Sequence, residues 1–130
     1  MAYKGQAAPT TSYQVYRAKV SDGKSVKVAV PASTTIDVNS FYELGGFFGP
    51  AFQSVKTKAG ETSEVVLNIE QAEYETNQIQ TTEDFAAGDP VYFADGKFTT
   101  DPTDAPRLVG RVTEGKDQNN VIWFILGPQV

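Results

Sequence analysis

Hydrophobic and polar residues alternate along most of the chain in short runs that end at turn residues. The clearest alternation is that of Val26, Val28 and Val30, whose intervening residues are small or polar. A period of two places alternate side chains on opposite faces, as in a half-buried β-strand. The run Val121–Leu126 is apolar at every position, which is typical of a central strand that is buried on both faces.

Runs rich in β-branched and aromatic residues predict strands along almost the whole chain. They lie at residues 13–20, 25–30, 36–38, 41–44, 52–58, 64–70, 91–93, 98–100, 108–112 and 121–126. Residues 71–82 have both helical and extended signals, and we favour a strand there. Asp22-Gly23 predicts a hairpin between the first two runs, and Asp95-Gly96 predicts another hairpin near the C-terminus. Residues 45–50, which contain Phe47 and Phe48, are expected to form a loop or a tight turn in which both phenylalanines are exposed or half-buried. No segment has the pattern of a long helix, so the fold class is all-β, a β-sandwich or β-barrel-like domain.

The chain divides into two parts by composition. Residues 1–12 are small and polar with no periodicity, which predicts a flexible, extended N-terminal arm. Residues 13–130 carry all the strand signals, so we expect a single β domain there.

The residue types needed for most enzyme chemistry are missing. The chain has no His and no Cys, which excludes a Ser-His-Asp triad, a thiolate nucleophile and a zinc site of the common kinds. Carboxylates cluster at 70–75, 83–89 and 101–104, but none of these clusters has the spacing of a calcium loop. We therefore interpret them as surface charge, and we expect no enzyme activity, no cofactor and no metal.

The net charge of −5 is unevenly distributed. Residues 1–60 carry a charge of +4 and residues 61–130 a charge of −9. The acidic half argues against nucleic-acid binding, which requires a basic patch. The split is consistent with a solvated acidic face, or with a basic half that docks on an acidic partner or on a second copy. The longest apolar run is much too short to span a membrane, and the N-terminus lacks the apolar core of a secretory signal.

The C-terminal half resembles a known protein family. Gly-Asp-x-Val-Tyr at 88–92 is followed by an Asp-Gly turn with a Thr-rich stretch, by Leu-Val-Gly-x-Val at 108–112 and by a last apolar strand. This order is similar to that of the small capsid decoration (cement) proteins of tailed phages. The residues that carry the resemblance are Gly88, Asp89, Val91, Tyr92, Gly96, Leu108, Gly110 and Trp123.

The resemblance implies a structural protein of the virion that binds the outer surface of the assembled capsid and stabilises it. It also implies the major capsid protein and neighbouring copies of the chain as partners, a homotrimer, and synthesis in the host cytoplasm. Candidate contact residues are five residues of the arm and the two phenylalanines of the 45–50 segment. They are Ala2, Tyr3, Lys4, Gln6, Pro9, Phe47 and Phe48.

Two other functions fit the sequence. One is a different self-assembling virion protein, such as a head fibre base or a tail-tube-like β protein. The other is a carbohydrate-binding module that uses exposed aromatic side chains.

Overall fold

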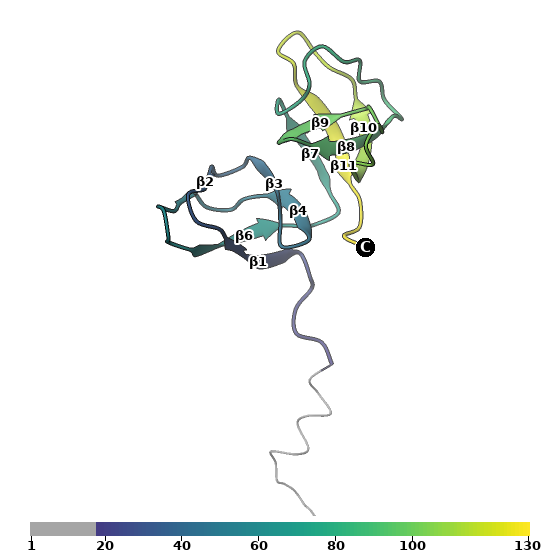
Figure 1. Cartoon of the computed structure of the whole chain (residues 1–130). Helices are drawn as coiled ribbons and strands as arrows, with labels where there is room; N and C mark the ends of the chain where they lie inside the picture. Colours follow the sequence, from purple (N-terminus) through teal and green to yellow (C-terminus); the bar gives the residue numbers. More distant parts are fainter. Residues whose placement is uncertain (1–17) are drawn as a thin grey trace, which may run out of the picture.

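The computed structural model describes residues 18–130, and within them it has eleven strands and no helix. Figure 1 shows that the strands form two lobes. The N-terminal lobe contains β1 (Ser25–Val30), β2 (Thr35–Ile36), β3 (Phe41–Leu44), β4 (Phe47–Pro50), β5 (Val55–Lys56) and β6 (Ser63–Asn68). The C-terminal lobe contains β7 (Glu73–Thr76), β8 (Pro90–Ala94), β9 (Lys97–Thr99), β10 (Arg107–Glu114) and β11 (Ile122–Leu126). The predicted all-β fold is confirmed.

The N-terminal lobe is built from two-stranded pairs. β1 pairs with β6, β2 with β5, and β3 with β4, all antiparallel. The valine alternation in β1 gives the expected face, because Val28 and Val30 are buried. They form a small core with Val65 and Leu67 of β6 and with other residues of the lobe.

The predicted hairpin between residues 13–20 and 25–30 is wrong where the structure describes it. Residues 18–20 are not in a strand, and the side chain of Val20 is fully exposed. The partner of β1 is β6, with Val28 opposite Val65. Pairing with β6 places Val28 and Val30 beside Val65 and Leu67, and all four side chains are buried. Residues 13–17 of the predicted strand lie outside the described part of the chain.

The C-terminal lobe is a five-stranded antiparallel sheet with the order β7-β11-β10-β8-β9. A parallel bridge joins Ile79 to Phe98, and the N–H of Phe98 donates to the carbonyl of Gln78 at 2.8 Å. The chain that leaves one end of the sheet at β7 therefore returns to cover the free edge of β9. Residues 78–80 therefore cover the edge of β9, so that β9 has no open edge, and the lobe has a barrel-like form.

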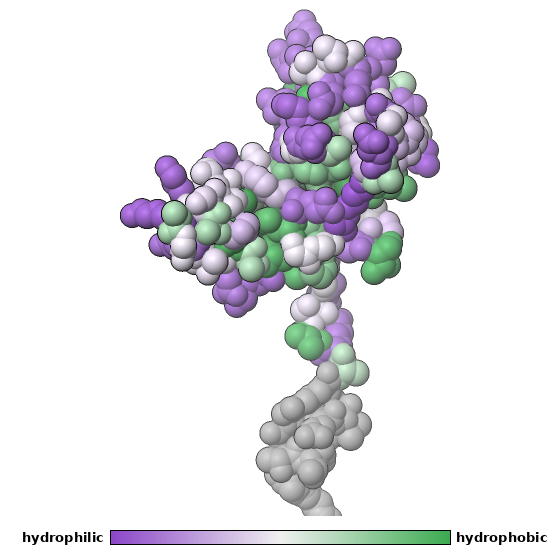
Figure 2. All heavy atoms as spheres, viewed as in Figure 1, coloured by the Kyte–Doolittle hydropathy of each residue, from purple (hydrophilic) through white to green (hydrophobic). Residues whose placement is uncertain are grey.

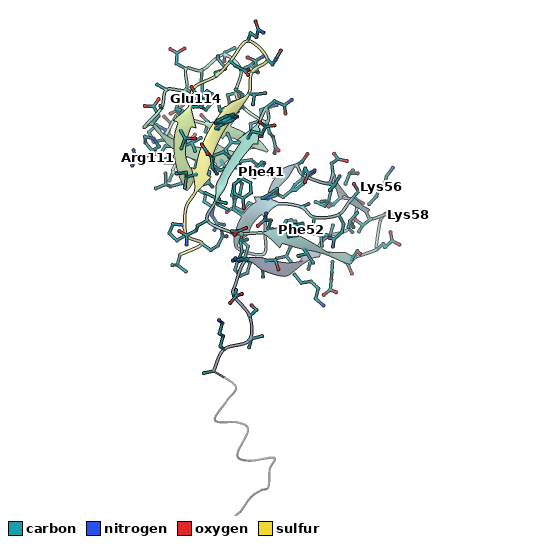
Figure 3. All side chains as sticks on the ribbon, turned by 180° about the vertical axis from the view of Figure 1, so that it is seen from behind. Phe41, Phe52, Lys56, Lys58, Arg111 and Glu114 are labelled. Carbon is teal, nitrogen blue, oxygen red and sulfur yellow. The ribbon has the colours of Figure 1, made fainter. Side chains whose placement is uncertain are left out.

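Phenylalanine side chains fill the C-terminal lobe. Phe98 lies in van der Waals contact with four other rings, and its centroid is 4.8 Å from that of Phe124 and 5.3 Å from that of Phe93. The two remaining rings, Phe41 and Phe48, come from the β3–β4 hairpin of the other lobe. The hairpin therefore belongs to both lobes, and its phenylalanines hold them together (Figure 3 labels Phe41 at this junction).

Two glutamine side chains fix this hairpin. Gln78 accepts a hydrogen bond from the N–H of Phe41 at 2.9 Å and donates to its carbonyl at 2.8 Å. Gln129 does the same for Phe48, at 2.8 Å and 3.0 Å. Each side-chain amide thus makes the pair of backbone hydrogen bonds that a neighbouring strand would otherwise make to that phenylalanine. The backbone of the hairpin keeps its hydrogen bonds where no strand pairs with it.

We expect Gln78→Leu to lower the free energy of unfolding by about 2 kcal/mol, because it leaves a part-buried N–H and carbonyl without partners. Gln78→Glu retains the acceptor and loses the donor, so its loss should be intermediate. Urea denaturation followed by circular dichroism measures both values. Equal stability of Gln78→Leu and the unsubstituted protein would contradict the role of this side chain.

The prediction of one domain over residues 13–130 stays a prediction. The described residues contain two clusters of buried side chains, one in each lobe. The shared β3–β4 hairpin connects them, because Phe41 and Phe48 belong to the C-terminal cluster while Tyr42 and Phe47 pack on the N-terminal one.

Candidate binding surface

The motif residues of the C-terminal half form the frame of the barrel-like lobe. Gly88 has a φ of +95°, which favours glycine, and its N–H donates to the carbonyl of Val112 at 2.8 Å. The carboxylate of Asp89 accepts from the N–H of Ala86 at 3.0 Å, and its carbonyl accepts from the N–H of Val112 at 2.9 Å. Gly88 and Asp89 therefore build the turn that attaches the start of β8 to β10.

The predicted Asp95-Gly96 hairpin is confirmed. Both residues have positive φ, +52° and +77°, as the tight turn between β8 and β9 requires. Val91 of β8 is fully buried, and Tyr92 points to the other face and is half-buried.

Gly110 marks a close backbone approach. A β-carbon at this position would overlap the carbonyl oxygen of Ile125 on the neighbouring strand. The register of β10 against β8 also shifts between Leu108 and Gly110. Only glycine permits this contact between β10 and β11, so the motif glycine has a structural role.

Phe48 is not exposed or half-buried as predicted, because it lies in the aromatic core. The tight turn predicted within 45–50 is present, but a strand follows it directly. Residues 47–50 form β4, and Phe48 is 1% exposed in the aromatic core. The turn of the hairpin is Gly45-Gly46, with φ of +59° and +88°. The Gly/Pro-rich composition reflects this tight turn and the close packing of Gly49, where a β-carbon would overlap the carbonyl oxygen of Asn68. Phe47 is half-buried against the N-terminal core, so part of its ring remains available.

The other candidate contact residues lie outside the described part of the chain. They are Ala2, Tyr3, Lys4, Gln6 and Pro9. Their role as contacts stays a prediction.

Glu83 is a carboxylate that the sequence assigned to the surface and that the fold uses internally. Its carboxylate accepts hydrogen bonds from the hydroxyl of Thr99 at 2.8 Å and from the N–H of Thr100 at 2.9 Å. Thr99 is buried. Glu83 therefore fixes the end of β9, where the polypeptide leaves the sheet.

We expect Glu83→Ala to lower the free energy of unfolding by about 2 kcal/mol, because hydrogen bonds to a charged acceptor are among the stronger ones. The adjacent Asp84→Ala is the matched control. Its side chain is exposed and makes no hydrogen bond within residues 18–130, so it should change stability by less than about 0.5 kcal/mol. Equal effects of the two variants in thermal unfolding would contradict this assignment.

An acidic hollow of about 730 Å³ lies between the lobes and the 101–106 loop. Arg107 crosses it and pairs with Glu43 at 3.2 Å. Hydrogen bonds from the hydroxyl and N–H of Thr103 hold the pKa of Asp101 below its usual value. Within residues 18–130, no group of three or more acidic side chains is arranged to hold a metal ion. No helix of the described chain has the length and hydropathy needed to cross a membrane.

The outer face of β10 and β11 carries exposed apolar residues that the sequence did not predict. β11 lies between β7 and β10, as expected of a central strand, but it is buried on one face only. Trp123, Ile125 and Leu108 are 44%, 48% and 59% exposed. In the view of Figure 2 the C-terminal lobe presents a mostly hydrophilic surface, so such apolar exposure is not general to the lobe. An exposed apolar group of this kind on a small protein indicates a contact surface.

A family model for phage cement proteins matches residues 20–127, which include both lobes. The chain belongs to the phage cement protein family. This result confirms the resemblance on which the sequence-based assignment rested. As a cement protein, the chain is a structural component of the virion that associates with the capsid and stabilises it. Membership in a family of structural virion proteins also argues against an enzyme.

Other comparisons add little to the family assignment. No curated protein matches the chain. Among solved structures, the chain is similar to the crystal structure of the N base of the head fibre gp8.5 of bacteriophage phi29. The identity is 16% and the TM-score is 0.42, over 79% of this cement protein and 94% of the other chain.

Proposed function

We propose that this cement protein binds the major capsid protein on the outer surface of the assembled phage head, as a trimer. The observation that carries the proposal is the family match over residues 20–127. It spans both lobes, so the whole described fold, and not one motif, supports the assignment.

The physical requirements of such a protein suit this fold. A decorating protein must be stiff, because its contacts are repeated over the lattice and each one is weak by itself. Binding at several points at once makes the overall attachment strong. The aromatic rings around Phe98 and the hydrogen bonds from the side chains of Gln78 and Gln129 join the lobes into a stiff unit. Such a unit can transmit load between the capsid subunits that it touches.

The N-terminal arm and the exposed part of Phe47 are the contacts we propose. Residues 1–12 contain an aromatic and a basic side chain, Tyr3 and Lys4, and no acidic residue. An arm of this composition can order on a capsid subunit or on a neighbouring copy, since the ordering cost is met at the moment of binding.

Sedimentation with undecorated heads tests the proposal. The purified protein is mixed with expanded heads that lack it, the heads are pelleted, and the bound copies are counted over a range of protein concentrations. We expect saturable binding at a fixed number of copies per head. Protein that remains wholly in the supernatant would contradict the proposal.

A matched pair of variants tests the arm. Lys4→Ala should weaken binding to heads, whereas Lys97→Ala, an equal change at an exposed residue of β9, should leave it unchanged. Analytical ultracentrifugation of the free protein tests the trimer separately, through a mass of three chains.

A further inference from the structure

The outer face of β10 and β11 has the form of a docking surface. Beside the exposed Trp123, Ile125 and Leu108 lies a groove of about 420 Å³, whose lining includes Leu108, Ile125 and Pro128. The next apolar residues along β11, Ile122, Phe124 and Leu126, face the opposite side and are buried. The apolar strip is therefore a second, separate apolar face of the same sheet.

Acidic side chains surround the strip. Trp123 stands between Glu75 of β7 and Glu114 of β10, and Ile125 has Glu73 beside it. The carboxylate of Glu73 accepts a hydrogen bond from the hydroxyl of Thr113 on β10, so it lies over the strip. None of these three glutamates takes part in an ion pair within residues 18–130.

Among the described residues of β10 and β11, the basic group on the outer face already has a hydrogen-bond partner. Arg111 lies beside Ile125, but its guanidinium donates to the carbonyl of Gly88 at 2.5 Å. Figure 3 shows Arg111 and Glu114 at the outer side of the C-terminal lobe, with Lys56 and Lys58 at the far end of the other lobe. A partner for the face must therefore bring its own apolar and basic groups.

The distribution of charge among the two lobes and the N-terminal segment identifies such a partner. Residues 71–130 have 4 basic and 10 acidic groups, a charge of −6, while residues 18–70 have 5 basic and 6 acidic groups, a charge of −1. Residues 1–17 have 2 basic groups, Lys4 and Arg17, and no acidic group. They also contain Tyr3, Tyr13, Val15 and Tyr16. The basic part of the chain is thus this segment and not the N-terminal lobe.

We propose that the strip formed by Leu108, Trp123 and Ile125 binds residues 1–17 of a second copy of the chain. The tyrosines and Val15 would cover the strip, and Lys4 and Arg17 would pair with Glu73, Glu75 and Glu114. Seventeen extended residues reach about 55 Å, enough to cross a sheet of this size and still link two copies. The inference rests on the proposed function, since it supplies the contact that would hold the trimer together.

The path of the chain favours a second copy over the same one. In Figure 1 residues 18–24 leave β1 in the direction away from the β7–β11 lobe. A contact in which one copy gives its segment and the next copy accepts it is head-to-tail, and such contacts form a ring when the rotation between copies closes. Three copies closed in this way form a trimer in which every strip is covered.

The single tryptophan of the chain reports on the site directly, because Trp123 stands in the strip and is the only one present. The chain of residues 1–130 is measured without heads from 1 to 200 µM, on the order of the range in which such contacts form. Fluorescence records the burial of Trp123, and sedimentation velocity records the mass. We expect a blue shift of the emission that accompanies the appearance of the larger species. A synthetic peptide of residues 1–17 should reverse the increase in mass by competition.

Charge reversal makes the test specific. Glu73→Lys/Glu75→Lys and Lys4→Glu/Arg17→Glu should each weaken self-association about tenfold, and the chain with all four changes should recover most of it. Glu64→Lys/Asp84→Lys alters the net charge as Glu73→Lys/Glu75→Lys does, away from the strip, and should associate like the unsubstituted protein.

Several results would overturn the inference. They are an emission maximum that does not depend on concentration, a blue shift already complete in the monomer, and a lack of rescue in the fourfold variant. A blue shift of Trp123 that appears only when heads are added would also overturn it, because the occupant would then be the capsid. Since the experiment uses free protein, its failure leaves the binding to heads, measured by pelleting, as a separate result.

Discussion

Replacing Phe48 with alanine is expected to lower the free energy of unfolding by about 3–5 kcal/mol. The ring is 1% exposed, and its centroid lies 4.7 Å from that of Phe93 and 5.7 Å from that of Phe98. Removing it leaves a cavity between the hairpin and the barrel-like lobe, which the rigid sheet cannot close. It also weakens the connection between the lobes, because Phe48 is one of the two rings that the hairpin contributes. Urea denaturation followed by circular dichroism gives the loss.

The neighbouring Phe47→Ala is the matched control, with the same side chain removed one position away. Phe47 is half-buried, so its loss should be less than half that of Phe48. Phe48→Leu should retain most of the stability and, if Phe48 is a core residue only, full binding to heads. A Phe48→Ala protein as stable as the unsubstituted one would contradict the position of this ring in the core.

Replacing Gly110 with alanine is expected to have an effect of similar size, about 3 kcal/mol or more. The added methyl group would overlap the carbonyl oxygen of Ile125. The backbone of β10 fixes the position of the β-carbon, and the oxygen belongs to the backbone of β11, so no change of rotamer relieves the overlap and β10 must move away from β11. We expect the variant to unfold at much lower denaturant concentration, or to be recovered largely unfolded.

Gly127→Ala is the control for Gly110→Ala. A β-carbon at Gly127 would meet its nearest atom, the carbonyl oxygen of Val109, at 3.6 Å, an ordinary contact distance. Its change in stability should stay below about 1 kcal/mol. Equal melting temperatures for the two variants would show that the strands at Gly110 are not held as closely as described.

Features determined by neighbouring residues were predictable from the sequence. The Asp95-Gly96 turn requires two residues that tolerate positive φ next to each other, and they stand together in the chain. The strand assignments for β8, β10 and β11 follow from short apolar runs in the same way. The family motif added order and spacing over these same strands, which is why it identified the family.

Features that join distant residues were not predictable. The partner of β1 is β6, and no local signal distinguishes it from the preceding residues 13–20. Phe48 has glycine and proline as neighbours, which suggested a loop, whereas its burial depends on Phe93 and Phe98 from another lobe. The hydrogen bonds that Gln78 and Gln129 make to the hairpin backbone have no sequence pattern. A side-chain amide that bonds to an unpaired strand can come from any part of the chain.

The binding surface was predictable only in part. Composition and motif led to a structural virion protein and to the arm, but the exposure of Trp123 was hidden in a run that is apolar at every position. Its signal lies in the strands beside it, where Glu75 and Glu114 flank the ring across the sheet. That pairing is known only once the register is known.

Electron cryomicroscopy of phage heads, reconstructed with and without the purified protein, tests the central claim most directly. We expect additional density on the outer surface of the decorated heads, with two lobes, in contact with the major capsid protein. Identical reconstructions of the two samples at saturating protein, or additional density on the inner surface alone, would contradict it.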